Sequence, residues 1–305
     1  MKQLLKKIDL LTRFSLVLFL AAATVFMAYF VIKVAGNDTT GPQITIDNDR
    51  IEISVQDDTS ALLEGVSAID DRDGDVTLSI MIESLSNIFN DNERIVTYAA
   101  VDKSHNVTTA KRTVVYTDYR SPEFHLAMPL RYPTGTSNLM SGMTVSDCLD
   151  GDITNSIKIT SESAYKAISG TYEMTFQASN SAGDVAELKT RVELYNTYTL
   201  RPVDILLKDY IVYVDRGAVF NAGDYLDSVA LNGVVYRFED GEGSYGDPYT
   251  EIKNQTIGIG SVIISGDVNT EEPGGYEVAY SLTMTTTSGD QVSGQIYLPV
   301  IVRNN

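Results

Sequence analysis

Two short aspartate-rich segments are the densest polar features of the chain. The first reads Asp-Asp-Arg-Asp-Gly-Asp over residues 70–75, and the second reads Asp-Cys-Leu-Asp-Gly-Asp over residues 147–152. Carboxylate oxygens at this density suit Ca²⁺, which takes about six to eight oxygen ligands. The candidate metal ligands are Asp70, Asp73, Asp75, Asp147, Asp150 and Asp152.

The same segments are also typical of tight turns without a metal. Asp-Gly is favoured where the backbone needs a positive φ, and an aspartate side chain can accept hydrogen bonds from nearby amides. The spacing does not match an EF-hand loop, and Cys148 stands where the first segment has Asp71, which removes one ligand. We therefore favour structural turns, and we expect no required cofactor and little dependence of stability on Ca²⁺.

A second candidate site is the segment 236–258, where aromatic and acidic residues alternate with glycines. Loops of this composition on a rigid scaffold are frequent binding surfaces. A disordered surface insertion is the alternative, and the absence of tryptophan makes sugar recognition less favoured. The candidate binding residues are Phe238, Tyr245 and Tyr249.

Catalytic chemistry has few residues to draw on. Cys148 is the single cysteine, and His105 and His125 are the two histidines of the chain. The histidines lie in different segments without a recognisable nucleophile or acidic partner, so we expect a protein that is not an enzyme. An intrachain disulfide is impossible, and each domain must be stabilised by its own core.

The net charge of −18 limits the partners. Such an acidic chain is unsuited to binding nucleic acid or anionic lipid through a basic patch. A protein partner or a surface assembly fits this charge, and a glycan remains a candidate.

Internal repeats organise the chain after residue 36. Residues 65–82 and 142–159 align without a gap, and the Asp-Gly-Asp segments coincide in that alignment. Residues 274–280 repeat the pattern of residues 170–176, which indicates a diverged third copy. The sequence therefore predicts domains at residues 37–118, 119–197 and 198–305, the last with an insertion at 236–258.

Hydrophobic residues alternate with polar ones in each copy. This period of two runs through residues 51–55, 76–82, 172–176 and 276–284, with turn residues between the runs. Alternation of this kind indicates strands with one face on a core and one face in water. Short strands and regular turns predict an all-β fold of antiparallel β-sandwiches.

The N-terminus predicts a membrane segment. The uncharged run 14–32 is just long enough as a helix to cross a hydrocarbon core of about 30 Å. It follows a short basic segment, 2–13, and the excess of cations places that segment in the cytoplasm. A cleaved secretory signal is the alternative, but residues 34–36 match a cleavage site poorly. We favour a retained anchor over residues 1–36, with the rest of the chain outside the cell.

The repeats resemble the bacterial immunoglobulin-like repeats of Gram-positive surface proteins. The matching motifs are the Asp-Thr-Thr-x-Pro opening at 38–42, the Gly-Val-x-Ala-x-Asp and Asp-Gly-Asp-Val-Thr run at 65–77, and the Asp-x-Ser-x-Asn turn at 102–106. His105 stands where that family often has glycine. The second copy keeps Asp-Gly-Asp-Ile-Thr at 150–154 and Gly-x-Tyr at 170–172.

This resemblance implies three tandem immunoglobulin-like β-sandwiches after one N-terminal transmembrane helix. It implies a structural or adhesive role at a bacterial cell surface, as a spacer or as a subunit of a surface assembly. A specific protein- or glycan-binding module that uses the third domain is the alternative, because such repeats serve several functions.

Overall fold

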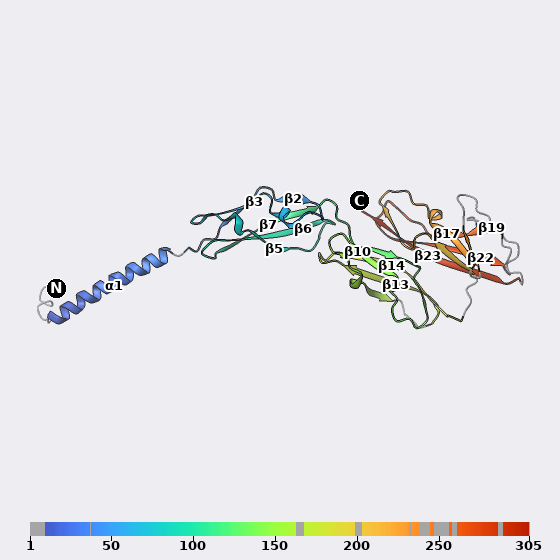
Figure 1. The fold of residues 1–305 in the computed structure, drawn as a ribbon, viewed down its shortest axis with the longest axis horizontal. Helices are drawn as coiled ribbons and strands as arrows, with labels where there is room; N and C mark the ends of the chain where they lie inside the picture. The colour runs from blue at the N-terminus through green and yellow to red at the C-terminus, as the bar shows by residue number, and fades with distance from the viewer. Residues whose placement is uncertain are drawn as a thin grey trace. The chain divides into compact units, whose positions relative to one another are not determined.

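The computed structural model describes residues 10–36, 38–162, 168–198, 203–231, 234–237, 245–246, 256–257, 261–285 and 289–304. These residues form an N-terminal helix followed by a body of β-strands in several sheets (Figure 1). The chain divides into two compact units, Met1–Asp118 and Tyr119–Asn305. This division coincides with the predicted end of the first domain. The predicted boundary after residue 197 lies inside the second unit.

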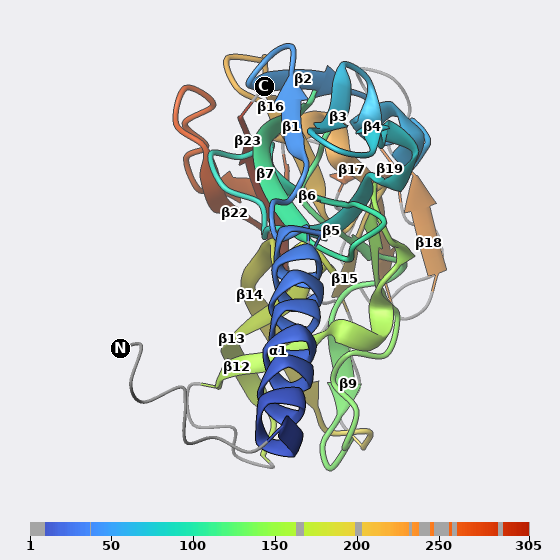
Figure 2. The ribbon, with the colours of Figure 1, turned by 90° about the vertical axis from the view of Figure 1, so that its left-hand side faces the viewer.

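Helix α1, Leu10–Gly36, is the blue helix in Figure 2. Exposed apolar side chains run along it from Phe14 to Ile32. The segment Thr12–Lys33 is long and apolar enough to cross a membrane, and none of it is buried in the protein. Phe14, Val25 and Ile32 are each about seven-tenths exposed, at 72%, 70% and 71%. A helix that is hydrophobic all round requires an apolar surrounding. A membrane anchor and a signal sequence both meet this description.

The first unit contains a three-stranded sheet, in the order β1-β3-β4, and a four-stranded sheet, in the order β2-β7-β6-β5. We call these two sheets the first sheet pair. Its strands are β1 (Gln43–Ile46), β2 (Arg50–Ile53), β3 (Val66–Asp70), β4 (Gly74–Asp75), β5 (Met81–Leu85), β6 (Glu93–Val101) and β7 (Val107–Tyr116).

The second unit opens with the second sheet pair, in the orders β11-β10-β8 and β12-β13-β14-β9. Its strands are β8 (Glu123–Leu126), β9 (Arg131–Pro133), β10 (Met143–Asp147), β11 (Gly151–Asp152), β12 (Lys158–Glu162), β13 (Gly170–Ser179) and β14 (Val185–Tyr195).

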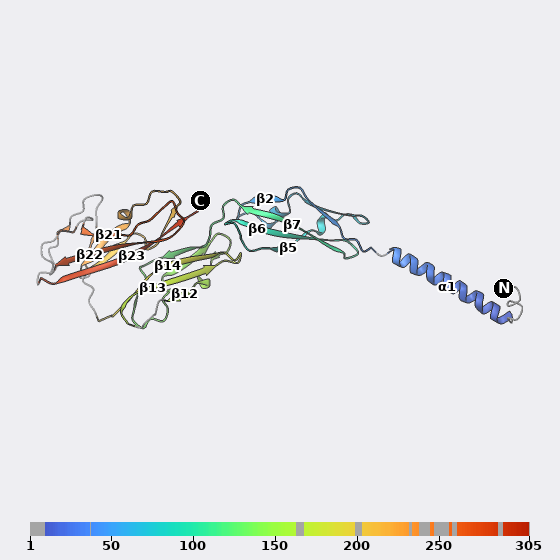
Figure 3. The same cartoon turned by 180° about the vertical axis from the view of Figure 1, so that it is seen from behind.

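The third sheet pair follows in the orders β15-β17-β18 and β16-β23-β22-β21, and the long β22–β23 hairpin is plain in Figure 3. Two short strands, β19 (Tyr245–Gly246) and β20 (Thr256–Ile257), pair separately. The other strands are β15 (Val203–Leu207), β16 (Val212–Asp215), β17 (Leu226–Leu231), β18 (Val234–Arg237), β21 (Ile263–Ser265), β22 (Gly274–Thr285) and β23 (Gln291–Arg303).

One topology recurs in the three sheet pairs, which confirms the internal repeat. The first and third strands of each copy pair antiparallel, as in β1–β3, β8–β10 and β15–β17. The second strand of each copy runs parallel to the last long strand, as in β2–β7, β9–β14 and β16–β23. The third copy also keeps a local contact of the second. Tyr172 Oη donates to the carbonyl of Ile168 and Tyr276 Oη to that of Glu272, each at 2.9 Å.

The predicted alternation places the core correctly in the long strands. Met174 and Phe176 of β13 are buried, at 2% and 0% exposed, and Tyr280 of β22 is buried at 0%. The second and third sheet pairs each enclose a core that both sheets of the pair supply. The strand prediction for residues 76–82 was wrong in its first half. Residues Thr77–Ser79 form a 3₁₀ turn, and Leu78 is fully exposed.

Three arginines tie the second and third sheet pairs together within the second unit. Arg131 contacts Glu193 at 3.0 Å and Asp204 at 2.5 Å. Arg191 pairs with Glu277 of β22 and lies over the ring of Tyr297 at 4.6 Å. Apolar residues add to this contact, because Ile211 and Ile301 pack against the core of the second sheet pair. The third arginine is Arg303, which bonds Glu123 and Asp215.

We expect Arg303→Met to lower the free energy of unfolding of the second unit by about 1–2 kcal/mol, since it removes partly exposed charge-assisted hydrogen bonds. Its guanidinium also lies over the Tyr213 ring at 5.4 Å. Urea unfolding of the chain, followed by tyrosine fluorescence, measures the change. Lys189→Met, an exposed position on β14, is the control with the same charge change. Equal effects of the two substitutions would contradict a bridging role for Arg303.

Candidate functional site

The two Asp-Gly-Asp segments form matching hairpins between β3 and β4 and between β10 and β11. Asp70 Oδ1 accepts the amides of Arg72 and Asp73 at 2.9 and 2.8 Å. Asp147 Oδ1 accepts the equivalent amides of Leu149 and Asp150, both at 2.9 Å. The glycine that follows has φ +75° in the first copy and +73° in the second, as a turn of this kind requires. The predicted turns are confirmed in both copies.

The last aspartate of each segment begins the next turn. Asp75 and Asp152 each accept the amide two residues later, from Thr77 and Thr154, at 2.9 Å. The threonine side chains, followed by those amides, hold the pKa of both carboxyls below the ordinary value. Both aspartates are exposed, and the contact that each makes is with the threonine two residues later.

The middle aspartate ties each hairpin to a neighbouring loop. Asp73 accepts the backbone amide of Lys103 at 2.8 Å and faces its Nζ at 3.3 Å. Asp150 accepts the amide and the hydroxyl of Ser181, at 2.5 and 2.7 Å.

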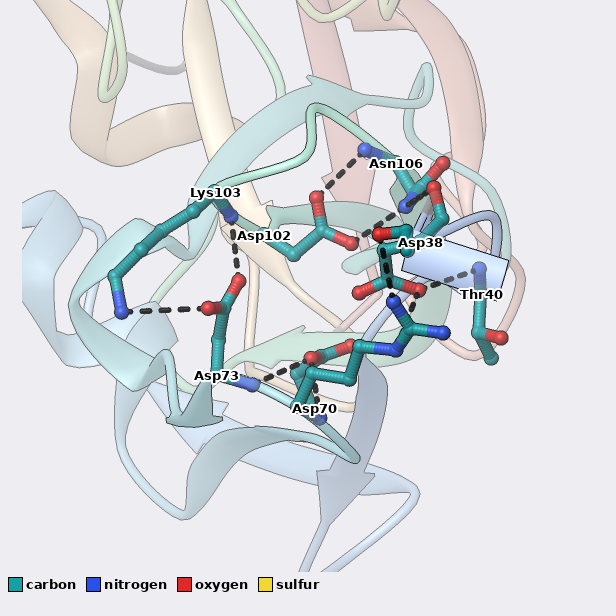
Figure 4. Close-up of polar contacts among 9 residues, drawn as sticks. Asp38, Thr40, Asp70, Asp73, Asp102, Lys103 and Asn106 are labelled. Atoms are coloured by element: carbon teal, nitrogen blue, oxygen red, sulfur yellow. Dashed lines mark hydrogen bonds and ion pairs between the residues drawn. The ribbon is translucent and has the colours of Figure 1, made fainter. Parts of the chain in front are cut away.

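In the first copy the hairpin meets further carboxylates (Figure 4). Oxygen atoms of Asp38, Asp70 and Asp71 lie within 4.8 Å of one another. Oxygen atoms of Asp70, Asp73 and Asp102 form a second such group, so Asp70 belongs to both. We call these five residues the aspartate cluster. Three segments supply it: the chain before β1, the β3–β4 hairpin, and the loop after β6.

Burial distinguishes three members of the aspartate cluster. The side chain of Asp38 is 4% exposed, and Asp70 and Asp102 are 2% and 5% exposed. Asp102 is held by Asn106, whose amide and side-chain nitrogen donate to its two oxygens at 2.8 and 2.7 Å. Asp38 Oδ1 accepts the amide of Thr40 at 3.1 Å.

Sequence reasoning selected Asp70 and Asp73 but missed Asp38 and Asp102 as members. Both missed residues begin repeat motifs, the Asp-Thr-Thr-x-Pro opening and the Asp-x-Ser-x-Asn turn. Both residues could have been found from these repeat motifs, because the fold brings the first residue of each motif to the hairpin.

The second copy fills the equivalent place with neutral groups. Asn180 stands where the first copy has Asp102, and its Nδ2 donates to Asp147 Oδ2 at 3.0 Å and to the Tyr119 hydroxyl at 2.8 Å. Tyr119 in turn donates to Asp184 at 2.7 Å. Burial, and then the Asp184 carboxylate, raise the pKa of Tyr119 well above its ordinary value.

Among the described residues, the other candidates make separate local contacts. Cys148 bonds the backbone of Arg120, its Sγ lying 3.1 Å from the carbonyl oxygen. His125 Nε2 pairs with Ser146 Oγ at 2.7 Å, and His105 takes a turn conformation with φ +69°. For the insertion 236–258, the structure places Tyr245 in the short strand β19, opposite Ile257. Phe238 and Tyr249 lie outside the described residues.

Comparisons with known proteins do not identify a family. No family model matches the chain. A stretch covering 48% of the chain is 29% identical to an uncharacterized 81.3 kDa protein of Acholeplasma phage L2, and the chain spans only 21% of that protein.

Solved structures align over much of the chain but with little similarity. One is the structure of the M60 catalytic domain with two carbohydrate-binding modules from Clostridium perfringens ZmpB. The alignment covers 87% of this chain and 31% of that chain, with 11% sequence identity and a TM-score of 0.21. Another is the protocadherin gamma B4 extracellular domain. That alignment covers 87% of this chain and 49% of the protocadherin chain, with 11% sequence identity and a TM-score of 0.18. At these TM-scores the alignments support no conclusion about this chain.

Proposed function

We propose that this chain is a membrane-anchored extracellular protein of a bacterial cell surface, with a structural or adhesive role as a spacer or as a subunit of a surface assembly. In this proposal α1 crosses the membrane through residues 14–32, and the preceding residues are cytoplasmic. The three sheet pairs are then immunoglobulin-like sandwiches outside the cell. The observation that carries the proposal is the exposed apolar surface of α1, which is long enough to be covered by a membrane.

A non-catalytic role is supported by how the reactive side chains are used. Cys148 and His125 each have a local partner, and His105 occupies a turn. One topology repeated three times, with charged contacts between the second and third copies, suits a part that transmits force or sets a distance.

The alternative is a binding module for a protein or a glycan in the third domain. Its candidate residues are Phe238, Tyr245 and Tyr249, all within the insertion 236–258. This segment departs most from the other two copies, and departures from a repeat are frequent sites of binding.

Two measurements on the full chain separate these functions. Chemical crosslinking on intact cells should join the chain to itself or to other surface proteins if it belongs to an assembly. A glycan array probed with the full chain in lipid nanodiscs should then show no specific signal. A specific glycan signal that disappears when residues 236–258 are deleted, with no crosslinked partner, would contradict the structural role and support the alternative.

A further inference from the structure

The aspartate cluster contains two buried carboxylate oxygens that the protein itself leaves unsatisfied. Asp38 Oδ2 and Asp70 Oδ2 are buried, and within the described residues neither has a hydrogen-bond partner. Every other oxygen of Asp70 and Asp102 has one, as does Asp38 Oδ1. A buried charge without a partner is strongly unfavourable, so buried charges in proteins are paired or coordinate a metal.

Nearby cations do not offset this charge. Arg72 approaches Asp38 only through Nε, at 3.9 Å from Oδ1, and its side chain is 46% exposed. Lys103 is 81% exposed and contacts Asp73, whose side chain is 16% exposed. Neither contact reaches the two unsatisfied oxygens. Several acidic side chains therefore converge around two buried oxygens, Asp38 Oδ2 and Asp70 Oδ2, and neither oxygen bonds one of these two cations.

The spacing of the oxygens matches a hard divalent cation. Two ligands on opposite sides of Ca²⁺ are separated by roughly 5 Å, twice the usual Ca²⁺–oxygen distance of about 2.3–2.6 Å. Both groups in the aspartate cluster lie within 4.8 Å, and they share Asp70. Mg²⁺ demands shorter bonds and retains several waters, and zinc favours nitrogen and sulfur ligands, so an all-carboxylate set favours Ca²⁺.

The second copy shows that the hairpin itself does not require these unsatisfied oxygens. Asp147 forms the same turn with the same two amides, but its Oδ2 accepts Asn180 Nδ2 at 3.0 Å. Cys148 stands in place of Asp71, and Asn180 in place of Asp102. The same hairpin therefore occurs in two forms. In the second copy hydrogen bonds reach both oxygens of Asp147, and in the first copy Asp38 Oδ2 and Asp70 Oδ2 have none among the described residues.

We propose that the first sheet pair binds Ca²⁺ at a site centred on Asp70. Asp38 supplies its free oxygen, and Asp71, Asp73 and Asp102 complete the oxygen set. Asp38 precedes β1, and Asp102 follows β6. The ion would therefore link the segment after α1 to the β3–β4 hairpin and to the loop after β6. Calcium then fixes the start of the extracellular body to its first domain. The site does not depend on the adhesive role proposed above.

The test is direct binding to the full chain, purified in detergent and freed of metal by a chelator. Isothermal titration with Ca²⁺ should show saturable binding, and Ca²⁺ should raise the melting temperature of the first unit by several degrees. Mg²⁺ should bind more weakly. No heat and no thermal shift at millimolar Ca²⁺ would overturn the proposal, and equal binding of Mg²⁺ would overturn the assignment to Ca²⁺.

Substitutions then locate the site. Asp38→Asn and Asp70→Asn should each weaken Ca²⁺ binding by roughly tenfold or more, because affinity follows the ligand charge. Asp147→Asn is the matched control in the second copy and should leave the affinity unchanged. In chelator, Asp70→Asn should melt no lower than the wild type, since its remaining oxygen can keep the two turn hydrogen bonds while a buried charge is removed.

This last comparison separates a ligand from a purely structural aspartate. An aspartate that served only the turn would give a variant that melts lower with and without Ca²⁺. That outcome, or an Asp147→Asn variant that loses binding as strongly as Asp38→Asn, would contradict the proposed site.

Discussion

Phe176→Ala should destabilise the second compact unit by about 3–5 kcal/mol, the usual cost of removing a buried aromatic ring. Phe176 is 0% exposed, in the centre of β13, and lies opposite Leu188 of β14, which is also fully buried. The alanine leaves a cavity enclosed by both sheets of the second pair. Denaturant unfolding followed by circular dichroism measures the loss.

Tyr195→Ala is the matched control for this substitution. Tyr195 is an aromatic residue of the same sheet, but it is 37% exposed at the end of β14. We expect it to cost less than Phe176→Ala, because more than a third of its surface stays in solvent after folding and no enclosed cavity is left. A Phe176→Ala variant as stable as the Tyr195→Ala variant would show that the assignment of the inward face of β13 is wrong.

Replacing both Leu18 and Val25 with arginine should remove the chain from the membrane fraction. Each arginine near the centre of a membrane helix costs about 2.5–3.5 kcal/mol of insertion free energy. Both residues belong to α1 and are exposed, at 64% and 70%, so the folded body loses no contact. Resistance of the chain to carbonate extraction measures retention, and the pair Leu18→Val with Val25→Leu is the control.

Two results would contradict a retained anchor. The double arginine variant could remain resistant to extraction, which would place membrane attachment elsewhere. Alternatively, mass spectrometry of the wild-type chain could find a mature N-terminus near Asn37. That finding would identify α1 as a cleaved signal sequence while leaving export intact.

The strands were predictable because their pattern is local. Alternating residues such as Tyr172, Met174 and Phe176 identify one face of a strand, and Met174 and Phe176 are buried as expected. Leu78 departs from the predicted alternation, and the reason is also local. The Asp75 carboxylate accepts the Thr77 amide, and the Ala68 amide donates to the Thr77 hydroxyl at 3.1 Å. These bonds hold residues 77–79 in a 3₁₀ turn that points Leu78 outward.

The aspartate cluster was predictable only in part because its members come from distant segments. Asp70 and Asp73 share a hairpin and are conspicuous in the sequence. Asp38 and Asp102 join them only after β1, β3 and β6 have assembled, and their burial cannot be read from composition. The unsatisfied oxygens depend on atomic positions, so the sequence alone favoured plain turns.

The charged contacts within the second unit were not predictable for a similar reason. Arg131, Arg191 and Arg303 lie on strands whose alternation shows only that they face outward. Their partners, Asp204, Glu277 and Glu123, belong to the other sheet pair. The internal repeats predicted separate domains, but a repeat pattern does not report whether two outer faces are complementary in charge.

Labelling of single cysteines in living cells tests most directly whether the β-strand body is anchored outside the cell. In a Cys148→Ser background, one variant carries Val219→Cys, a position that is 98% exposed, and another carries Lys6→Cys before the helix. Both are expressed as full chains in a Gram-positive host and treated with a membrane-impermeant maleimide. Our account predicts labelling of Val219→Cys in intact cells, and of Lys6→Cys only after the membrane is opened. Labelling of Lys6→Cys in intact cells, or protection of Val219→Cys until the membrane is opened, would contradict it.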